Sequence, residues 1–304
     1  MKKKILVVGG TGFIGYYLCK AFVKKNYIVH SISTKKPKNI RFVRNVRYIL
    51  SDISNLRKIK KDIKKKNTYD YIVNAAGYVD HNNKLKTINS HFKGCVNLFN
   101  IFSGSKLKRF IQIGSSGEYG NLQSPHDEHF RSNPSTIYNM AKKKASDFLL
   151  KMYRKKNFPI TIFRLYLTYG PKQDDNRFIP FVIINCIKDK IFELSHCNQY
   201  RDFIYIDDVV DIIIKSIDNK NAIGQIFNLG TGKAIKLKSI IKKIKKYIKG
   251  GIPIYNKKKL RNDELQKIYP KMNKVKKYFR WKHKVRFDDG LLNTIKYYKI
   301  NFKH

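Results

Sequence analysis

A tyrosine and a lysine stand four residues apart near the middle of the chain, at Tyr138 and Lys142. On a helix, residues at this spacing share one face, so the phenol and the ammonium group can meet. A positive neighbour favours the phenolate, which makes the phenol a usable proton donor and acceptor near neutral pH. Ser115 follows an apolar run, and its hydroxyl could hydrogen-bond the reacting oxygen. These side chains predict a proton-transfer site; the alternative for the tyrosine and lysine is an exposed helix-surface pair.

The elements that must position these groups begin at the N-terminus. Residues 5–8 are an apolar run that predicts a buried strand, and residues 16–25 predict an amphipathic helix. Three glycines follow the strand at three-residue spacing, at Gly9, Gly12 and Gly15. In a dinucleotide-binding turn, the first glycine allows the turn, the second lets the backbone approach a pyrophosphate, and the third lets the helix pack closely. An ordinary glycine-rich turn is the alternative.

Strands and helices then alternate along the chain. This alternation predicts an α/β fold with a doubly wound, Rossmann-type parallel sheet, because helical crossovers join parallel strands. Ligands bind such sheets beyond the carboxyl ends of the strands, where Ser115 would lie. The predicted strands are 27–32, 46–50, 71–74, 110–113 and 160–165, and the predicted helices are 54–66 with Ser54 as N-cap, 87–102 and 138–156.

The end of the second predicted strand bears on the choice of cofactor. An NAD-preferring enzyme carries an acidic residue there, which accepts hydrogen bonds from the ribose. This chain has Ser33, Thr34, Lys35 and Lys36 instead. Hydroxyl groups and cations suit a 2′-phosphate, so NADP(H) is favoured over NAD(H). The alternative is that a lysine-rich chain places lysine here by chance.

The chain is strongly basic, with 65 Lys and Arg against 21 Asp and Glu and a formal net charge of +44. Such an excess could indicate binding to nucleic acid or to an anionic membrane. The lysines are spread over the whole chain, however, and the densest runs, 58–66 and 240–249, alternate with isoleucine at helical spacing. We interpret the charge as a lysine-rich composition, which would still attract an anionic substrate.

Hydrophobic residues make up 42% of the 304-residue chain, enough for a sizeable core. No apolar run approaches the roughly 20 residues that a membrane helix needs, and no signal peptide is expected. The four cysteines, Cys19, Cys95, Cys186 and Cys197, form no C-x-x-C pair. We expect them to be small buried residues in a reducing compartment, which predicts a cytoplasmic protein without a metal site.

Several stretches resemble a known family. The segment Gly-Gly-Thr-Gly-Phe-Ile-Gly at 9–15, the tyrosine–lysine pair and Tyr-Gly-Pro at 169–171 resemble the extended short-chain dehydrogenase/reductases, the NAD-dependent epimerase/dehydratase group. The segment Arg-Asp-Phe-Ile-Tyr-Ile-Asp-Asp-Val at 201–209 is very specific for this group. Residues 226–232, 279–281 and 288–291 resemble its late strand and closing elements, so the resemblance runs essentially from end to end.

The resemblance implies a role for each candidate residue. Ser115, Tyr138 and Lys142 would form the catalytic triad. The residues expected to bind the cofactor are Gly9, Thr11, Gly12, Phe13, Ile14, Gly15, Ser33, Thr34, Lys35, Asp52, Ile53, Asn74, Ala75, Ala76, Tyr138, Lys142 and Leu165. The residues expected to bind a nucleotide sugar are Ser115, Ser116, Arg177, Arg201 and Arg261, with solvated surface as the alternative for Arg177 and Arg261.

The resemblance also implies an organisation of the chain. Residues 1–165 would form the NAD(P)-binding Rossmann domain. Residues 166–304 would mainly form a smaller α/β portion that binds the nucleotide sugar, and the chain would return in part to the Rossmann domain. Family members often dimerise through two long helices beside the active site, so a homodimer through 87–102 and 138–156 is expected, although the positive charge would oppose it.

The absence of acid and cysteine side chains that other branches of the family carry narrows the possible reactions. Dehydratases of the family carry an acid two places after the catalytic hydroxyl residue, and often another just before that acid. This chain has Gly117 and Ser116 there, which disfavours dehydration. The fucose-synthase branch has cysteine at the position of Gly117, so coupled 3,5-epimerisation is disfavoured too. We interpret Glu118 first as a loop residue and second as a substrate contact.

Simple redox chemistry at a sugar carbon remains. Stretches 164–170, 176–180 and 201–210 are similar to nucleotide-linked 4-keto-6-deoxyhexose reductases of the abequose-synthase type. We therefore expect NADPH-dependent reduction of a C4 ketone in surface-polysaccharide sugar synthesis, with Tyr138 giving the proton. An NAD-dependent nucleotide-sugar 4-epimerase is the alternative, weakened by Leu167 where epimerases often carry asparagine. A non-catalytic nucleic-acid-binding member is a remote alternative, which the intact triad disfavours.

Overall fold

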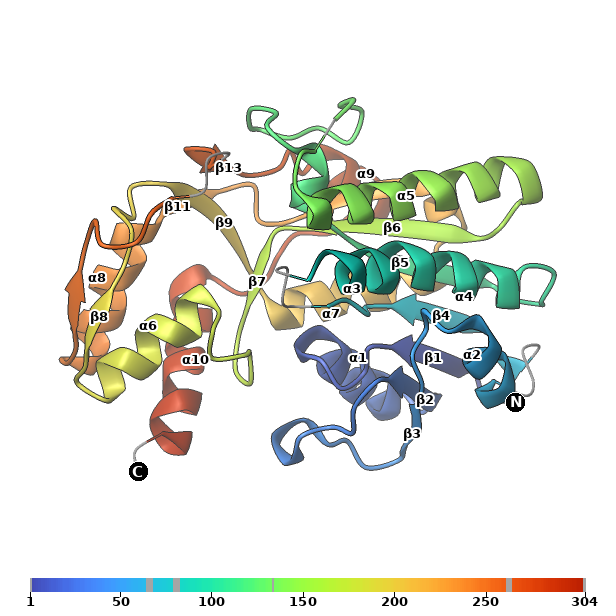
Figure 1. The fold of residues 1–304 in the computed structure, drawn as a ribbon, viewed down its shortest axis with the longest axis horizontal. Coiled ribbons are helices and arrows are strands. Elements are labelled where there is room, and N and C mark those ends of the chain that lie inside the picture. Colours follow the sequence, from blue (N-terminus) through green and yellow to red (C-terminus); the bar gives the residue numbers. More distant parts are fainter. Residues whose placement is uncertain (1, 64–67, 79–82, 133, 261–263, 303–304) are drawn as a thin grey trace.

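The computed structural model describes residues 2–302, apart from 64–67, 79–82, 133 and 261–263. The strands of the large sheet are β1 (Lys4–Val8), β2 (Ile28–Ser33), β3 (Val46–Leu50), β4 (Tyr71–Asn74), β5 (Arg109–Ser115), β6 (Ile160–Leu165) and β10 (Gln225–Leu229). They lie in the order β10-β6-β5-β4-β1-β2-β3, and every neighbouring pair is parallel (Figure 1). The strand order runs outward in both directions from the β1–β4 pair, which confirms the predicted doubly wound sheet.

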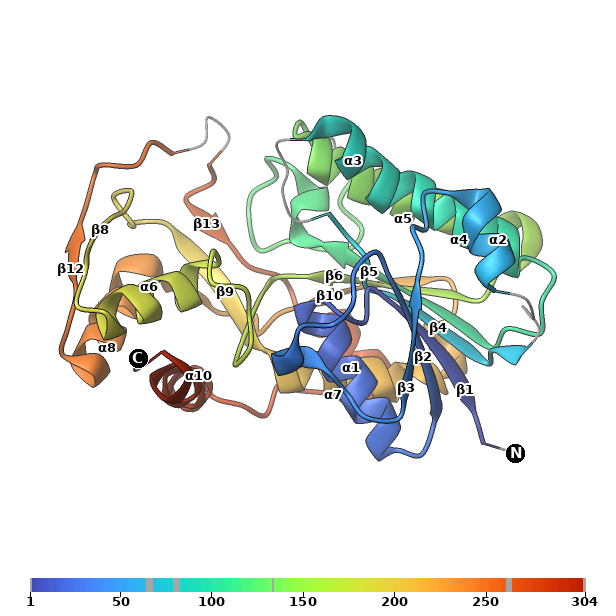
Figure 2. The same ribbon diagram turned by 60° about the horizontal axis from the view of Figure 1, so that its bottom comes forward.

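Helices cover both faces of this sheet (Figure 2). On one face lie α2 (Leu56–Asp62), α4 (Gly94–Phe102) and α5 (Ile137–Lys156), and on the other lie α1 (Phe13–Lys24), α7 (Ile206–Ile217) and α9 (Asn273–Phe279). Neighbouring residues of one strand therefore enter different cores: Leu6 packs with α4 and α5, and Val7 packs with α1 and α7. Since both faces are buried, β1 must be a continuous apolar run.

The helix predicted at 87–102 is divided in the structure. It consists of α3 (Lys84–Ile88), a π-helical turn (Asn89–Lys93) and α4. A π-turn contains one residue more than an α-helical turn and often occurs at functional sites. Hydrophobic periodicity over so short a stretch does not distinguish a π-turn from an α-helix, so the sequence predicted one continuous helix.

The helix predicted at 54–66 is shorter in the structure, and residues 64–66 lie outside the described residues. The predicted N-cap, Ser54, is wrong. Asn55 caps α2 instead, because its Oδ1 accepts a hydrogen bond from the Lys58 N–H at 3.0 Å. Ser54 precedes the cap, and its N–H donates to Asp52 Oδ1 at 2.8 Å.

A smaller α/β part faces the carboxyl ends of the large sheet (Figure 1). It contains β7 (Leu167–Tyr169), β9 (Tyr200–Tyr205), β11 (Ala234–Lys236) and β13 (Lys267–Ile268), the pair β8 (Ile191–Glu193) and β12 (Ile252–Ile254), and the helices α6 (Phe178–Ile187), α8 (Leu237–Ile248) and α10 (Phe287–Asn301). β9 is the centre of its sheet, because β7 and β13 pair with it in parallel and β11 pairs antiparallel.

The chain passes between the two parts more than once. β6 ends at Leu165, yet α7 packs on a face of the large sheet and β10 pairs with β6 as its seventh strand. We therefore propose the predicted division with one refinement. Residues 1–165 form the Rossmann part, residues 166–304 form mainly the smaller part, and residues 206–229 together with α9 return to the large sheet.

The four cysteines are buried and have free thiols. Burial raises the pKa of the Cys19 and Cys95 thiols to about 12, so these side chains pack as small core residues and are not thiolates at neutral pH. Within the described part of the chain, no helix has the length and apolar character needed to cross a bilayer.

Candidate active site

The predicted glycine turn joins β1 to α1. Gly9 has a φ of +81°, a left-handed conformation that favours glycine, and its N–H donates to Ile32 O at 2.7 Å. A Cβ on Gly15 would overlap the Gly9 carbonyl oxygen, so helix and turn pack as closely as predicted. A Cβ on Gly12 would meet only that oxygen, at 3.3 Å, which leaves open space in front of Gly12. The turn therefore combines tight packing with room for a ligand.

The N-terminus of α1 fits the phosphates of a dinucleotide. α1 has 12 residues, and its first turn contains no side-chain cap and no acidic residue. The first N–H groups of a helix have no partner within the helix, and with the helix dipole they favour an anion. The predicted residues 13–15 supply these groups next to Gly12. Thr11 donates its N–H to Ser33 Oγ at 3.3 Å, which ties the turn to the end of β2.

The ends of β2 and β3 lie beside this turn. Thr34 and Lys35 follow β2 and are exposed. After β3, Asp52 is exposed, whereas Ile53 is buried and packs against Gly94 of α4. Because the carboxyl ends of parallel strands meet at one edge, the residues predicted to hold the ribose and the adenine are brought to the same edge as the glycine turn.

β4 and β5 carry a polar pair at this edge. Asn74 ends β4, and its Nδ2 donates to Gln112 Oε1 of β5 at 2.8 Å. The Oδ1 of Asn74 accepts a hydrogen bond from the Ala76 N–H at 3.3 Å. A Cβ on Gly9 would overlap the backbone of Ala75 and Ala76, so small residues let the two turns touch. Through this contact, the surface at the carboxyl ends of the strands extends from β1 to β4.

Tyr138 and Lys142 lie one turn apart on α5, as predicted. Lys142 is 6% exposed, and its Nζ donates to Ile113 O of β5 at 2.8 Å. This anchor holds the ammonium group beside the strand that ends in Ser115. The ring of Tyr138 meets the ring of His91 at nearly a right angle, with 5.0 Å between the centroids. The structure thus collects the three predicted triad residues on β5 and the helix packed against it.

Ser115 ends β5 and pairs in register with Leu165, the last residue of β6. Ser115 also caps the 3₁₀ turn Ser116–Tyr119, because its Oγ accepts a hydrogen bond from the Gly117 N–H at 3.1 Å. A Cβ on Gly117 would overlap the side-chain amide of Asn139 on α5. Glycine at this position therefore lets the serine turn lie directly against the helix that carries the tyrosine and lysine.

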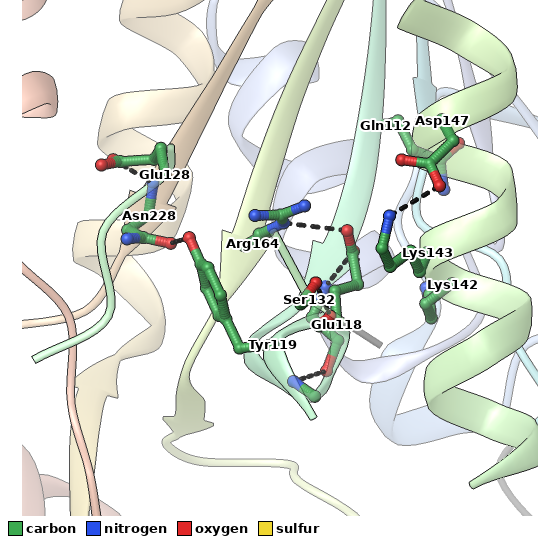
Figure 3. Close-up of polar contacts among 12 residues, drawn as sticks. Gln112, Glu118, Tyr119, Glu128, Ser132, Lys142, Lys143, Asp147, Arg164 and Asn228 are labelled. Carbon is green, nitrogen blue, oxygen red and sulfur yellow. Dashed lines mark hydrogen bonds and ion pairs between the residues drawn. The ribbon is translucent and has the colours of Figure 1, made fainter. Parts of the chain in front are cut away.

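Glu118 is fully buried, so the second interpretation of this residue, a substrate contact, is wrong. Its Oε1 accepts a hydrogen bond from the Ser115 N–H at 2.9 Å, and its Oε2 forms an ion pair with Arg164 Nε at 2.9 Å (Figure 3). Burial lowers the pKa of Arg164, but Glu118 and Tyr119 together raise it above its usual value, so the guanidinium stays charged. An arginine within an apolar strand was the sequence signal, because a buried charge needs a partner.

A second polar network lies next to this pair (Figure 3). The Tyr119 hydroxyl donates to Asn228 Oδ1 of β10 at 2.7 Å, and the Asn228 N–H donates to Glu128 Oε1 at 2.8 Å. Burial raises the pKa of Tyr119 to about 12. This phenol therefore stays neutral at pH 7 and serves as a hydrogen-bond donor that ties the serine turn to β10.

The predicted substrate arginines lie in different environments. Arg201 belongs to β9 and is 8% exposed; it forms an ion pair with Glu264 and donates to Tyr200 O at 2.7 Å. Arg177 is exposed at the start of α6. Arg261 lies outside the described residues. Of the two that the structure describes, Arg201 is the one whose guanidinium is held by partners within the chain.

The glycine-containing loop 230–233 after β10 is occupied by a carboxylate of the chain itself. Asp202 of β9 is 1% exposed and accepts hydrogen bonds from the N–H groups of Thr231, Gly232 and Lys233 at 2.7 to 3.1 Å. Its Oδ1 also accepts a hydrogen bond from Thr231 Oγ1 at 3.0 Å. These donors therefore close the loop onto β9, where the Asp202 carboxylate already uses them.

The described residues contain no cluster of histidine, cysteine and carboxylate side chains that could hold a metal ion. The residues predicted from sequence to bind cofactor, by contrast, line one edge of the large sheet. They lie at or just after the carboxyl ends of β1, β2, β3, β4 and β6, and α5 adds the tyrosine and lysine. This arrangement can hold an extended dinucleotide and place a proton donor at one end of it.

Known proteins share this architecture. The family model described as the NAD dependent epimerase/dehydratase family matches residues 5–230. CDP-abequose synthase of Salmonella muenchen is 29% identical over 277 residues, which cover 88% of this chain and 89% of that protein. The putative UDP-glucose 4-epimerase of Methanocaldococcus jannaschii is 25% identical over 316 residues, which cover 98% of this chain and 99% of that protein.

Solved structures agree on the fold. The UDP-glucose 4-epimerase of Thermotoga maritima, solved with UDP-glucose, has a TM-score of 0.92 and 22% sequence identity, and the match covers 98% of this chain and 99% of that one. The family model spans the glycine turn, the serine turn and the tyrosine–lysine pair. This chain therefore belongs to the NAD dependent epimerase/dehydratase family, within the extended short-chain dehydrogenase/reductases.

Proposed function

We propose that this enzyme reduces the C4 ketone of a nucleotide-linked 4-keto-6-deoxyhexose with NADPH, in the cytoplasm, for the synthesis of a surface-polysaccharide sugar. Its family makes it an NAD(P)-dependent enzyme of nucleotide-sugar chemistry. Similarity to CDP-abequose synthase over 88% of the chain supports this choice within the family.

One observation carries the proposal: the serine turn offers a substrate no carboxylate. Its single acid, Glu118, is fully buried and is bound to the Ser115 N–H and to Arg164. Ser116 and Gly117 stand where dehydratases carry acids. Loss of water from a sugar needs an acid to protonate the leaving hydroxyl group, whereas reduction of a ketone needs one proton donor. This turn therefore suits reduction of a ketone rather than dehydration.

In the proposed mechanism, the reduced nicotinamide supplies the hydride to C4 when it is bound. Tyr138 donates its phenolic proton to the carbonyl oxygen, which becomes the product hydroxyl group. Ser115 donates a hydrogen bond to the same oxygen and fixes its position. Lys142, anchored on Ile113 O, would hold the ribose and stabilise the phenolate that remains on Tyr138. Arg201 would hold the substrate pyrophosphate through its fork of donors, in exchange for Glu264.

The preference for NADPH is part of the proposal. Thr34, Lys35 and Lys36 are exposed at the end of β2 and suit a 2′-phosphate. Arg41, another cation of the β2–β3 connection, is buried and bound to Asp174 at 2.9 Å, so its charge is already used. Lys35 and Lys36 are the exposed cations directly after β2, and we propose them for a phosphate on the ribose.

Replacing both Lys35 and Lys36 by alanine should weaken NADPH binding by about 10-fold to 100-fold, because hydrogen bonds to charged groups contribute roughly 1.5–3 kcal/mol. The Kd of NADH should change by less than about threefold, since NADH carries no 2′-phosphate. Fluorescence titration of both cofactors measures these constants. Lys24→Ala, at the far end of α1, is the matched control. Equal weakening of both cofactors would contradict a 2′-phosphate site.

The function itself is tested with CDP-, dTDP-, GDP- and UDP-linked 4-keto-6-deoxy sugars and either NADPH or NADH. Cofactor oxidation and product mass are followed together. Stoichiometric oxidation of NADPH, with a product heavier by the mass of two hydrogen atoms, is the expected result. Unchanged cofactor with every ketone would overturn the reductase proposal.

A 4-epimerase is the second candidate. It is favoured by similarity to a putative UDP-glucose 4-epimerase over 98% of the chain, and it would use the same triad. Such an enzyme retains NAD(H), so it would convert an ordinary nucleotide sugar without net cofactor oxidation. A product of unchanged mass and altered stereochemistry, detected by NMR with UDP-glucose as probe, would identify it.

We also propose that two copies form a dimer through α3, α4 and α5. Leu85 and Ile88 of α3 are 69% and 42% exposed, and a second copy would cover them. The net charge opposes association, so the dimer fraction should rise with salt that screens the charge. Light scattering at about 0.05 M and 0.5 M salt measures this, with Debye lengths of roughly 14 and 4 Å. A monomer under both conditions would contradict the dimer.

A further inference from the structure

One helical segment, α3 through the π-turn to α4, touches two of the loops that line the predicted cofactor site. Gly94 begins α4 and packs so closely on Ile53 that a Cβ would overlap that side chain. Asn97 Nδ2 donates to Ile53 O at 2.8 Å. In the π-turn, Ser90 Oγ accepts a hydrogen bond from the Tyr78 N–H at 3.1 Å. The segment thus connects the loop after β3 with the loop after β4.

His91 lies in the middle of the π-turn and is 4% exposed. Its imidazole covers Gly77, where a Cβ would overlap Cε1, and its Nε2 lies 3.3 Å from Tyr78 O. The imidazole also meets the Tyr138 ring, with centroids 5.0 Å apart and an angle of 82° between the planes. One side chain therefore fills the space between the loop after β4 and the phenol on α5.

The π-turn explains how one helical segment contacts both Tyr138 and Ile53. Each residue of an α-helix turns the chain by about 100°, so the extra residue of the π-turn rotates everything that follows by about this angle. With it, His91 faces Tyr138 while Gly94 and Asn97 face Ile53. In a continuous α-helix, Gly94 and Asn97 would point in a different direction relative to His91.

We infer that His91 is a positioning residue for Tyr138, which holds the phenol ring in a fixed place relative to the backbone of Gly77. The inference deepens the proposed function and rests on it, because a precise ring position matters only if the Tyr138 hydroxyl transfers a proton. His91 acts through ring contact and volume. The same imidazole therefore fixes the position of the Tyr138 phenol and that of the loop after β4.

The test compares His91→Ala, which removes the ring, with His91→Phe, which keeps an aromatic ring. His91→Ala should lower kcat by about 10-fold to 100-fold, since small displacements of a reacting group are costly. The KM for the nucleotide-linked ketone and the Kd of NADPH should change by less than about threefold. His91→Phe should restore kcat to within about fivefold of the wild type. Lys93→Ala, exposed in the same π-turn, is the control and should change nothing.

A second readout needs no cofactor and no turnover. In protein labelled at tyrosine ¹³Cζ, the Tyr138 NMR signal is assigned by its loss in Tyr138→Phe. His91→Ala should shift and broaden this signal, because a neighbouring ring is lost and the phenol can move. His91→Phe should leave it narrow. If His91→Ala does not fold, as judged by circular dichroism, His91→Leu, which also lacks a ring, replaces it, and the same directions of change are expected.

Wild-type kcat together with an unmoved Tyr138 signal in the ringless variants would overturn the inference. An equal loss in cofactor affinity and kcat would also overturn it, because His91 would then serve the cofactor loop alone. Failure of the proposed function gives a different pattern. In that case no ketone is reduced, or Tyr138→Phe remains active, while the NMR comparison still decides whether His91 positions the phenol.

Discussion

Tyr138→Phe is expected to lower kcat by a factor of about 10² to 10⁴, the range for loss of a general acid. The substitution removes one hydroxyl group and keeps the ring, so the contact with His91 and the start of α5 should persist. The KM for the ketone and the Kd of NADPH should therefore stay within about threefold of the wild type. Initial rates of NADPH oxidation and fluorescence titration measure the two effects separately.

Tyr153→Phe is the matched control for this experiment. It makes the same chemical change on the same helix, far from the serine turn, and should leave kcat unchanged. Lys142→Ala should differ from Tyr138→Phe, because it should weaken cofactor binding as well as lower kcat. If Tyr138→Phe kept most of its activity, the assignment of Ser115, Tyr138 and Lys142 as the triad would be wrong.

Glu118→Gln is expected to lower the free energy of unfolding by about 3–5 kcal/mol, the usual cost of breaking a buried ion pair from one side. The change keeps the size of the side chain but leaves the Arg164 guanidinium, 3% exposed, without its counter-charge. It also weakens the hydrogen bond to the Ser115 N–H, so activity should fall with stability. Urea unfolding followed by circular dichroism measures the shift in midpoint at unchanged slope.

The exposed pair on α5 provides the control. Lys143 Nζ and Asp147 Oδ2 lie 2.7 Å apart, and the Asp147 side chain is 54% exposed (Figure 3). Asp147→Asn should change stability by at most about 0.5 kcal/mol, because water screens a surface pair. A double variant, Glu118→Leu with Arg164→Met, should be more stable than Glu118→Gln, since it leaves no unpaired charge. Equal stability of Glu118→Gln and Asp147→Asn would show that the buried pair contributes little.

Local patterns in the sequence were sufficient for the frame of the molecule. The strands predicted at 46–50, 71–74 and 160–165 coincide with β3, β4 and β6 residue for residue. Apolar runs bounded by turn residues determine β4 and β6, because neighbouring side chains fall on opposite buried faces, whereas β3 is an edge strand that is only partly buried. The glycine spacing at 9–15 and the tyrosine–lysine spacing on α5 are local too, since a turn and a helix fix their own geometry.

Contacts between distant segments could not be predicted in this way. Glu118 pairs with Arg164, 46 residues away, whereas the local pattern around the glutamate predicts a loop residue or a substrate contact. The π-turn that carries His91 to Tyr138 was predicted as plain helix. Residue types and spacing determined the strands, the glycine turn and the triad candidates, because these depend on neighbours in the chain. Burial and pairing depend on which strands and helices become neighbours in space. The tertiary structure alone therefore decided that the Glu118 carboxylate is buried and that the Tyr138 ring contacts His91.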